Sequence, residues 1–327
     1  MNLPGRLSLA RLPTPLQRMD RLSEAWGGPT IWVKRDDLTG FEVSGNKIRK
    51  LEFHLAAARE AGADTLVTCG AAQSNHCRAT ALAAAPLGFK TIVLLRTADG
   101  GPPARSEANH LLMEMAGADI RYVTPAEYAR RDSAMEEAAE EVRAAGGAPW
   151  VIAEGASDAL GMWGFVAAIE ELAAQLEGLP PMAAVWHAAS SGGTTAGMAW
   201  GADLLGMEAP VVGCCIGETA GEVLERVESI WAQASGPGAP PDPGSRLTLV
   251  DAHVGLGYGR ATPEELAIGA DATRLTGMLL DPTYTGKALV GLKREIEAGR
   301  YGVGDHVVFW HTGGGFAAFV EGFHVVR

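Results

Sequence analysis

Cysteine is scarce in this chain, with only four among 327 residues. Cys69, Cys77, Cys214 and Cys215 show neither CxxC spacing nor the cysteine density of a disulfide-stabilised scaffold. We therefore expect reduced thiols, with no zinc site, no other metal site and no disulfide bridge. Cys214 and Cys215 are adjacent within an apolar run, which favours simple burial.

Long hydrophobic runs are also missing. No apolar stretch approaches the roughly 20 residues of a membrane-spanning helix. The first residues lack both the apolar stretch and the small-residue cleavage site of a signal peptide. We expect a cytoplasmic protein without a membrane partner.

Clusters of basic residues are absent as well. The chain has 27 Lys and Arg against 39 Asp and Glu, for a formal net charge of −12. Binding to nucleic acid needs a concentrated positive surface that neutralises phosphates. A nucleic-acid partner is therefore not expected.

Hydrophobic residues and glycine, in contrast, are plentiful. Hydrophobic residues make up 47% of the chain, which is enough for a globular core. Glycine accounts for 42 of the 327 residues, about 13%, where about 7% is usual, so many tight turns or close approaches of the backbone to a ligand are expected. The length suggests two domains, although one large α/β unit would also fit.

Short apolar runs alternate with helical patterns through most of the chain. The predicted strands span residues 65–69, 91–95, 120–123, 150–153, 184–188, 211–216, 247–250 and 306–310. The predicted helices include 47–61, 106–116, 135–145, 162–176, 195–205, 221–234 and 287–298. This alternation predicts an α/β fold with parallel sheets built from right-handed βαβ units. A Pro- and Gly-rich stretch at 234–245 predicts an exposed loop.

Ligands of open α/β sheets bind beyond the carboxyl ends of strands, where the following helices begin. The first such junction is residues 44–50, with the sequence SGNKIRK. Ser44 is typical of a helix N-cap, which would place Lys47 in the first helical turn. The helix dipole there favours a neutral amine, as an imine-forming lysine requires. A lysine pointing into solvent is the ordinary alternative.

The second and third junctions are rich in hydroxyl and amide groups. Residues 70–76 read GAAQSNH and could hold a carboxylate and a ring hydroxyl, although a simple Ser/Asn helix cap is common. Residues 189–197 read ASSGGTTAG and could form a phosphate-binding cup at a helix start. A tight βα turn is the ordinary alternative, but the extra hydroxyls favour an anion. Because residues 189–197 match neither GxGxxG nor a P-loop, dinucleotide and nucleoside-triphosphate binding are disfavoured.

Two late segments complete the set. Residues 280–287 read LDPTYTGK, and residues 311–315 read HTGGG, where the glycines would let a flat ring approach closely. One lysine, one phosphate cup, hydroxyl ligands and a glycine floor together describe a pyridoxal-phosphate site.

These segments, together with Gly257-Tyr258-Gly259, resemble the signature segments of the D-cysteine desulfhydrase and 1-aminocyclopropane-1-carboxylate (ACC) deaminase family, which includes L-cysteate sulfo-lyases. The matches occur in family order across nearly the whole chain. The resemblance implies the tryptophan-synthase-β-like fold, type II among pyridoxal-phosphate enzymes, with two open twisted, mostly parallel sheets flanked by helices. It implies a large domain from residues 1–50 and 163–327 and a smaller inserted domain from 51–162.

The resemblance also implies roles for individual residues. Lys47 would hold pyridoxal 5'-phosphate covalently, and Asn75 would bond the ring hydroxyl. Thr312 would lie at the pyridine nitrogen or beside the substrate, and Tyr258 and Tyr284 near the reacting atoms. The phosphate would be held by Ser191, Gly192, Gly193, Thr194 and Thr195, and the substrate by Ser74, Asn75, His76, Tyr258, Tyr284 and Thr285, with Lys47, Tyr284, Ser74 and Tyr258 as the catalytic set.

Within the family, two positions favour a desulfhydrase. ACC deaminases typically carry Glu and Leu where this chain has Thr285 and Thr312. The resemblance therefore predicts β-elimination from D-cysteine, giving pyruvate, sulfide and ammonia. The alternative is an L-cysteate sulfo-lyase that releases sulfite, for which Arg49, Arg78, His76, His253, Thr283 and Thr285 are conceivable donors to the sulfonate.

In the expected mechanism, the substrate displaces Lys47, whose freed amine removes the Cα proton before the β-substituent leaves. ACC deamination, racemisation or dehydration is a weaker alternative, and a binding protein without turnover is weaker still. The resemblance also implies a homodimer of a carbon–sulfur lyase in amino-acid metabolism.

Overall fold

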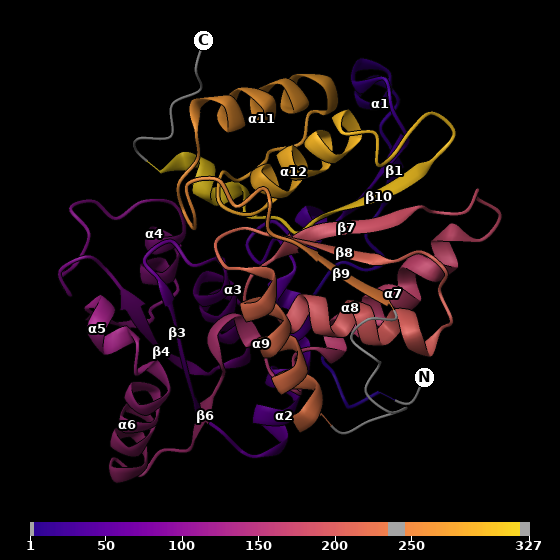
Figure 1. Cartoon of the computed structure of the whole chain (residues 1–327). Coiled ribbons are helices and arrows are strands. Elements are labelled where there is room, and N and C mark those ends of the chain that lie inside the picture. Colours follow the sequence, from indigo (N-terminus) through magenta and orange to yellow (C-terminus); the bar gives the residue numbers. More distant parts are fainter. Residues whose placement is uncertain (1–2, 235–245, 321–327) are drawn as a thin grey trace.

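The computed structural model describes residues 3–234 and 246–320 of the chain, so most of the loop predicted at 234–245 lies outside the described residues. Two sheets, each flanked by helices, form the two halves of the molecule (Figure 1). The predicted α/β architecture is confirmed. Each predicted strand overlaps a strand of the structure.

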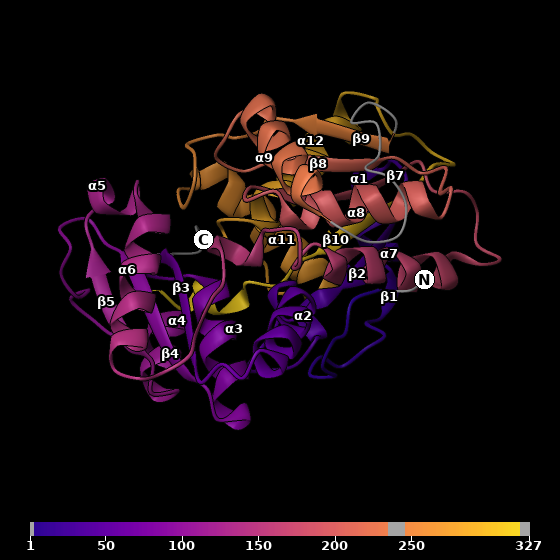
Figure 2. The same cartoon turned by 90° about the horizontal axis from the view of Figure 1, so that it is seen from below.

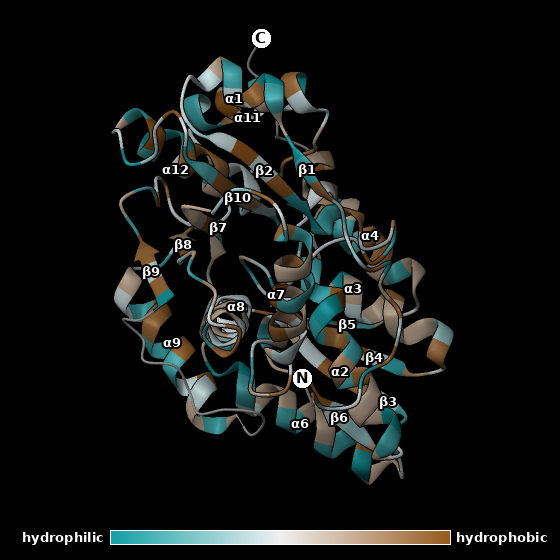
Figure 3. Ribbon diagram, turned by 90° about the vertical axis from the view of Figure 1, so that its right-hand side faces the viewer, coloured by the Kyte–Doolittle hydropathy of each residue, from teal (hydrophilic) through white to brown (hydrophobic). Residues whose placement is uncertain are grey.

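The six-stranded sheet forms the larger half. Its spatial order is β1 (Leu16–Arg18), β2 (Thr30–Arg35), β10 (His306–His311), β7 (Ala184–Ala189), β8 (Val211–Cys215) and β9 (Leu247–Val250). All neighbouring pairs are parallel except β1 with β2. In Figure 3, brown apolar segments run along strands of this sheet, including β2 and β9.

Helices cover both faces of this sheet because its strands alternate their buried side chains between two cores. Trp186 and Phe309 face α1 (Asp20–Trp26), α11 (Pro263–Thr276) and α12 (Thr285–Glu297). Val185 and Val308 face α7 (Trp163–Leu176) and α8 (Gly193–Leu204), and α9 (Ala220–Gln233) packs on α8. This two-sided burial is typical of parallel sheets.

The smaller half is a parallel four-stranded sheet. Its order is β5 (Asp119–Val123), β4 (Lys90–Arg96), β3 (Thr65–Ala71) and β6 (Pro149–Val151). One face packs on α6 (Arg131–Ala144), and the other on α2 (Lys47–Glu60), α3 (Asn75–Ala84) and α4 (Ala108–Met115). The short helix α5 (Pro125–Tyr128) precedes α6. Single 3₁₀ turns occur at η1 (Asp36–Leu38), η2 (Ala85–Leu87), η3 (Glu154–Ala156) and η4 (Gly315–Phe319).

Helix α2 runs between the two halves, as Figure 2 shows from below. Ile48, Leu51 and Leu55 are fully buried against the smaller sheet, as their helical spacing predicts. Helix α2 also packs against α7 of the larger half. The two sheets divide the strands as the domain prediction does, while the domain bounds at 50/51 and 162/163 stay a proposal.

All four cysteines are buried free thiols, as expected. None of the helices in the described part of the chain is long and apolar enough to cross a membrane.

Candidate active site

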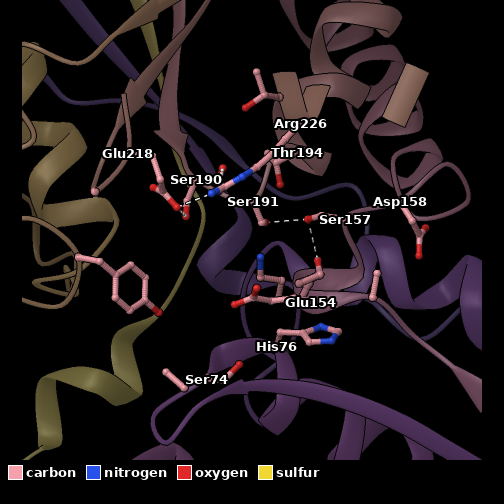
Figure 4. A pocket seen from close by; sticks show the side chains of 18 of the residues that line it. Ser74, His76, Glu154, Ser157, Asp158, Ser190, Ser191, Thr194, Glu218 and Arg226 are labelled. Carbon is pink, nitrogen blue, oxygen red and sulfur yellow. Dashed lines mark hydrogen bonds and ion pairs between the residues drawn. The ribbon is translucent and has the colours of Figure 1, made fainter. Parts of the chain in front are cut away.

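A cleft of about 880 Å³ lies between the two halves, where the predicted junctions meet. Figure 4 shows its wall from close by. All of the predicted site residues line it except Gly193 and Thr285. The sequence therefore identifies most of a wall that is assembled from segments far apart in the chain.

Lys47 is the first residue of α2 and points into this cleft. Burial of the ammonium lowers the pKa of Lys47 to about 8, against an opposing influence of the Glu154 carboxylate. The N-cap is Asn46, so the prediction of a cap at Ser44 is wrong. Ser44 instead donates its hydroxyl to the carbonyl of Asp37, within the turn that precedes the helix.

Close backbone contact fixes the position of Lys47. Gly45 has φ +110°, and a Cβ there would lie 2.8 Å from the carbonyl oxygen of Thr312. The main-chain N–H of Asn46 donates to that same carbonyl at 3.0 Å. Only glycine fits at position 45, so the HTGGG segment is tied directly to the start of the lysine helix.

The loop between β7 and α8 forms a cup around the N-terminus of α8. Gly192 has φ +89°, and the helix starts at Gly193. A Cβ on Gly193 would lie 2.7 Å from the Cα of Ser157 and 2.8 Å from Lys50 Nζ, so the loop can pack this closely only with glycine. The free N–H groups of the first helical turn point out of such a cup and favour an anion.

Lys50 is a buried lysine beneath this cup that is not among the predicted site residues. Its Nζ donates to the carbonyl of Gly155 at 3.2 Å and to Ser157 Oγ at 3.0 Å, and Ser157 Oγ lies 2.7 Å from Ser191 Oγ. No carboxylate pairs with Lys50 among residues 3–234 and 246–320, and burial lowers its pKa far below the usual lysine value. Figure 4 shows Ser157 beside Ser191, with a dashed line for the contact between their hydroxyls.

The donor set around Lys50 fits the phosphate group that the resemblance implies. A buried lysine without a carboxylate partner, a helix N-terminus and several hydroxyls together suit a phosphate dianion, whose charge would favour the protonated form of Lys50. The signal was available in the sequence, because Lys50 is three residues after Lys47 and so shares its helix face.

A second helix N-terminus faces the cleft at α3. Ser74 is the N-cap, with its Oγ accepting the N–H of Cys77 at 3.1 Å. A Cβ on Gly70 would lie 2.5 Å from that Oγ, so strand and helix meet closely only because residue 70 is glycine. The N–H groups of Asn75 and His76 belong to the first turn and are suited to a carboxylate.

His76 is neutral in this setting. Burial, followed by the nearby positive charges, holds the pKa of His76 far below its usual range. Its Nε2 lies 2.7 Å from Thr68 Oγ1, which already donates its hydrogen to the carbonyl of Ile152. His76 Nε2 is therefore the donor, and the ring serves to anchor the start of α3.

Two tyrosines, Tyr258 and Tyr284, form another part of the cleft wall. The hydroxyls of Tyr258 and Tyr284 are 2.6 Å apart, with the rings edge to face. Desolvation of its hydroxyl raises the pKa of Tyr258 to about 12, although the residue as a whole is 38% exposed, and burial raises the pKa of Tyr284 well above its usual value. Both phenols are thus protonated at neutral pH. Because one bond between them uses one proton, the pair has a second proton to donate into the cleft.

Asp281 and Lys287 hold the segments that carry these tyrosines. The Asp281 carboxylate accepts the N–H groups of Thr283, Tyr284 and Thr285 and the Thr285 hydroxyl. Thr285 is fully buried and turned toward Asp281, away from the cleft wall. Lys287 Nζ donates to the carbonyls of residues 254 and 257, both at 2.8 Å, which ties the Tyr258 loop to α12.

The charged residues at the outer cleft are largely paired. Arg131 binds Glu154 at 3.1 Å, and Arg226 binds Glu218 at 2.8 Å (Figure 4 labels the second pair). Arg96 stacks on the ring of Tyr128, with 5.0 Å from its guanidinium carbon to the ring centroid. These outer-cleft residues are not among the predicted site residues, because none of them belongs to a recognisable motif.

Most of the side chains considered as donors to a sulfonate already bind other groups of the protein. Arg49 binds Asp36 at 2.8 Å and Glu171 at 3.0 Å, and His253 lies 2.8 Å from Glu295. Arg78 donates to the carbonyls of Glu42 and Ser44. Of the six, only His76 lines the cleft.

Comparison with known proteins gives consistent matches along the chain. The family profile described as "Pyridoxal-phosphate dependent enzyme" matches residues 7–313. A D-cysteine desulfhydrase of Yersinia pestis is 39% identical over 316 residues, covering 96% of this chain and 95% of that protein. A D-cysteine desulfhydrase of Klebsiella pneumoniae is 38% identical over 320 residues, with the same coverage.

Solved structures agree with these matches. The crystal structure of an ACC deaminase homologue matches with a TM-score of 0.84 and 32% identity, covering 97% of this chain and 94% of that one. A fungal L-serine ammonia-lyase from Rhizomucor miehei matches with a TM-score of 0.68 over 94% and 95% of the two chains. At 16% identity, that second likeness is one of fold alone.

Proposed function

Because this chain belongs to the family of pyridoxal-phosphate dependent enzymes, we propose that it cleaves D-cysteine with water to pyruvate, hydrogen sulfide and ammonia. The observation that carries the proposal is the Tyr258–Tyr284 hydroxyl pair in the same cleft as Lys47. A base for the Cα proton and an acid for the departing sulfur are the two groups that β-elimination needs.

The residues of the cleft match the parts of the cofactor. Lys47 would bind it covalently, and the cup at Ser191–Thr195 with Lys50 would hold its phosphate. Asn75 would donate to the ring hydroxyl, and Thr312 would lie at the pyridine nitrogen or beside the substrate. When bound, pyridoxal phosphate supplies an electron sink for the negative charge that develops at Cα.

The chain itself then handles the substrate and its protons. The first turn of α3, from Ser74 to His76, would bind the substrate carboxylate. Lys47 Nζ would take the Cα proton, and its pKa of about 8 leaves far more neutral amine near neutral pH than an ordinary lysine has. The tyrosine pair would give a proton to sulfur, which leaves with the electron pair of the C–S bond.

The cleft supports sulfide better than sulfite as the leaving group. A sulfonate would bring a full negative charge that needs free cationic donors. Arg49, Arg78 and His253 are bound to other groups. At the cleft, Arg131 and Arg226 are paired with carboxylates, and Arg96 is stacked on the ring of Tyr128. Sulfide needs only the protonated phenols. ACC deamination has less support, because ACC deaminases typically carry Glu and Leu where this chain has Thr285 and Thr312. Here Thr285 is turned away from the cleft, and it is Thr312 that lines it.

The test is a matched substrate panel for the purified protein loaded with pyridoxal phosphate. Pyruvate, sulfide and sulfite are measured with D-cysteine, L-cysteine, L-cysteate, β-chloro-D-alanine and ACC. The proposal predicts pyruvate and sulfide from D-cysteine and pyruvate from β-chloro-D-alanine. Sulfite from L-cysteate with no sulfide from D-cysteine would replace the proposal with the sulfo-lyase reaction.

A homodimer in the cytoplasm is part of the same proposal. Apolar side chains are exposed together near η4, where Phe41, Leu279 and Phe319 are 77%, 52% and 67% exposed. Phe41 packs edge to face on Phe316 of that turn. Burial of this surface by a second copy would remove it from water, and light scattering of the eluting protein measures the mass directly.

A further inference from the structure

We propose that Asn109 is a positioning residue that fixes the amide of Asn75, so that the Asn75 NH₂ group faces the cofactor ring. This inference rests on the proposed function in one respect, namely that Asn75 contacts the cofactor. Asn109 lies on α4, has no exposed surface and does not line the cleft among the described residues.

The orientation follows from the hydrogen-bonding capacity of each group. Arg78 Nε lies 3.1 Å from Asn109 Oδ1, and a guanidinium can only donate, so this Asn109 atom must be the oxygen. Asn109 Nδ2 is then the donor that lies 3.1 Å from an Asn75 side-chain atom. That atom must accept and is therefore Asn75 Oδ1. The Asn75 Nδ2 group is left facing away from Asn109 as a donor.

The remaining bonds of Asn109 lock its own position. Its Nδ2 also donates to the main-chain carbonyl of Gln73 at 3.1 Å, and its main-chain N–H donates to Gln73 Oε1 at 3.0 Å. Every hydrogen-bonding atom of the Asn109 amide group thus has a partner on or beside the first turn of α3. A rotation of the Asn75 amide would place two donors against each other.

Arg78 extends this network to the lysine helix. Besides Asn109, it donates to the carbonyl of Ser44 at 2.9 Å, three residues before Lys47. Arg78 is fully buried, and its guanidinium carbon lies 5.0 Å from the ring centroid of Phe316. One connected chain of bonds therefore sets both the start of α2 and the amide of Asn75.

The backbone at Ala108, directly before Asn109, has a strained conformation. Ala108 has φ +51°, and only Ala156 shares positive φ among the non-glycine residues of 3–234 and 246–320. Such a conformation is unfavourable for a residue with a Cβ and persists where the surroundings demand it. Here it starts α4 at the point where the Asn109 N–H meets Gln73 Oε1.

The experiment is a double-mutant cycle on cofactor binding to the apoprotein. Dissociation constants for pyridoxal phosphate are measured by tryptophan fluorescence for wild type, Asn109→Ala, Asn75→Ala and the double variant. We expect Asn109→Ala to weaken binding about tenfold, as for the loss of one oriented hydrogen bond, and to add nothing when Asn75 is already alanine. Independent, multiplying effects of the two substitutions would overturn the proposal.

Two further measurements separate positioning from loss of structure. The pH at which the bound cofactor changes its absorbance should shift in Asn109→Ala and should not shift further in the double variant. Ala108→Gly removes the strain but keeps the Asn109 side chain, so it should bind the cofactor within about twofold of wild type. Equal weakening by Ala108→Gly would contradict a role for the amide itself.

Asn109→Ser replaces Asn109→Ala in the same cycle if the alanine variant does not fold. The cycle needs no substrate, so it stands apart from the test of the proposed reaction. Wild-type protein that binds pyridoxal phosphate but releases no sulfide from D-cysteine would refute the reaction and leave the role of Asn109 to be decided by the cycle.

Discussion

Replacement of Lys287 by methionine tests how the cleft keeps Tyr258 in place. Lys287 Nζ is buried and donates to two carbonyls of the loop that carries Tyr258, both at 2.8 Å. Methionine has a similar length but cannot donate. The loop would then lose its tie to α12, the helix that begins directly after Tyr284.

The size of the effect follows from these two bonds. A hydrogen bond to a charged group contributes about 1.5–3 kcal/mol, and removal of the buried ammonium from its costly environment offsets part of that sum. A net loss of about 2 kcal/mol in the free energy that holds the Tyr258 loop in place corresponds to a decrease of about 30-fold in kcat, since about 1.4 kcal/mol is a factor of ten. KM should change less, because the carboxylate site at α3 is on the other wall.

The assay is steady-state pyruvate formation from D-cysteine and from β-chloro-D-alanine, with thermal unfolding measured in parallel. Lys293→Met is the matched control, because Lys293 is on the same helix but pairs with Glu297 at the surface. It should behave as wild type. If Lys287→Met kept kcat within about twofold of that control, the loop would not depend on Lys287 and the reasoning would be refuted.

Three other predictions follow from the packing and charges of the site. Gly193→Ala should weaken pyridoxal phosphate binding at least about tenfold, because its Cβ would lie 2.7 Å from the Cα of Ser157. Glu171→Gln should lower the free energy of unfolding by about 3 kcal/mol at pH 7, because it leaves the buried Arg49 and its neighbour Lys34 with less negative charge. In wild type, the pKa of Glu171 is lowered to about 2 by Arg49 and Lys34, so this stability is present above the usual carboxyl pKa and is lost as pH falls toward 2. The rate at which apoprotein captures pyridoxal phosphate should rise with pH around a midpoint near 8, because only neutral Lys47 reacts.

Each of these has a control or a contrary outcome. Gly221→Ala should leave cofactor binding unchanged, since nothing lies within 4 Å of a Cβ there. For Glu171→Gln, urea unfolding that loses stability equally at pH 7 and pH 2.5 would contradict the charge argument. A capture rate that stays flat from pH 7 to 9 would show that Lys47 titrates elsewhere.

Local sequence patterns were sufficient for the elements that lead into the site. The apolar runs of β3 and β7, followed by glycine and hydroxyl residues, predicted where helices begin and anions bind. Strand β2 escaped prediction because Lys34 is buried within it and breaks the alternation of apolar and polar residues. The buried ammonium of Lys34 is paired with Glu171, which lies 137 residues further along the chain. It also donates to the carbonyl of Thr14 and to Gln175 Oε1.

Contacts between distant segments account for what the sequence did not reveal. Thr285 was predicted to bind the substrate in the cleft, but its hydroxyl donates a hydrogen bond to the buried carboxylate of Asp281. Asn109 falls inside a predicted helix, yet its role depends on how closely α4 approaches the start of α3. No pattern in a single sequence encodes such an approach.

The most direct test of the central claim is the yield of sulfide and pyruvate from D-cysteine by wild type and by Lys47→Ala. The account predicts equal amounts of the two products from wild type and neither from the variant. Equal turnover by Lys47→Ala, or consumption of D-cysteine without sulfide, would contradict the assignment of this cleft as the site of a carbon–sulfur lyase.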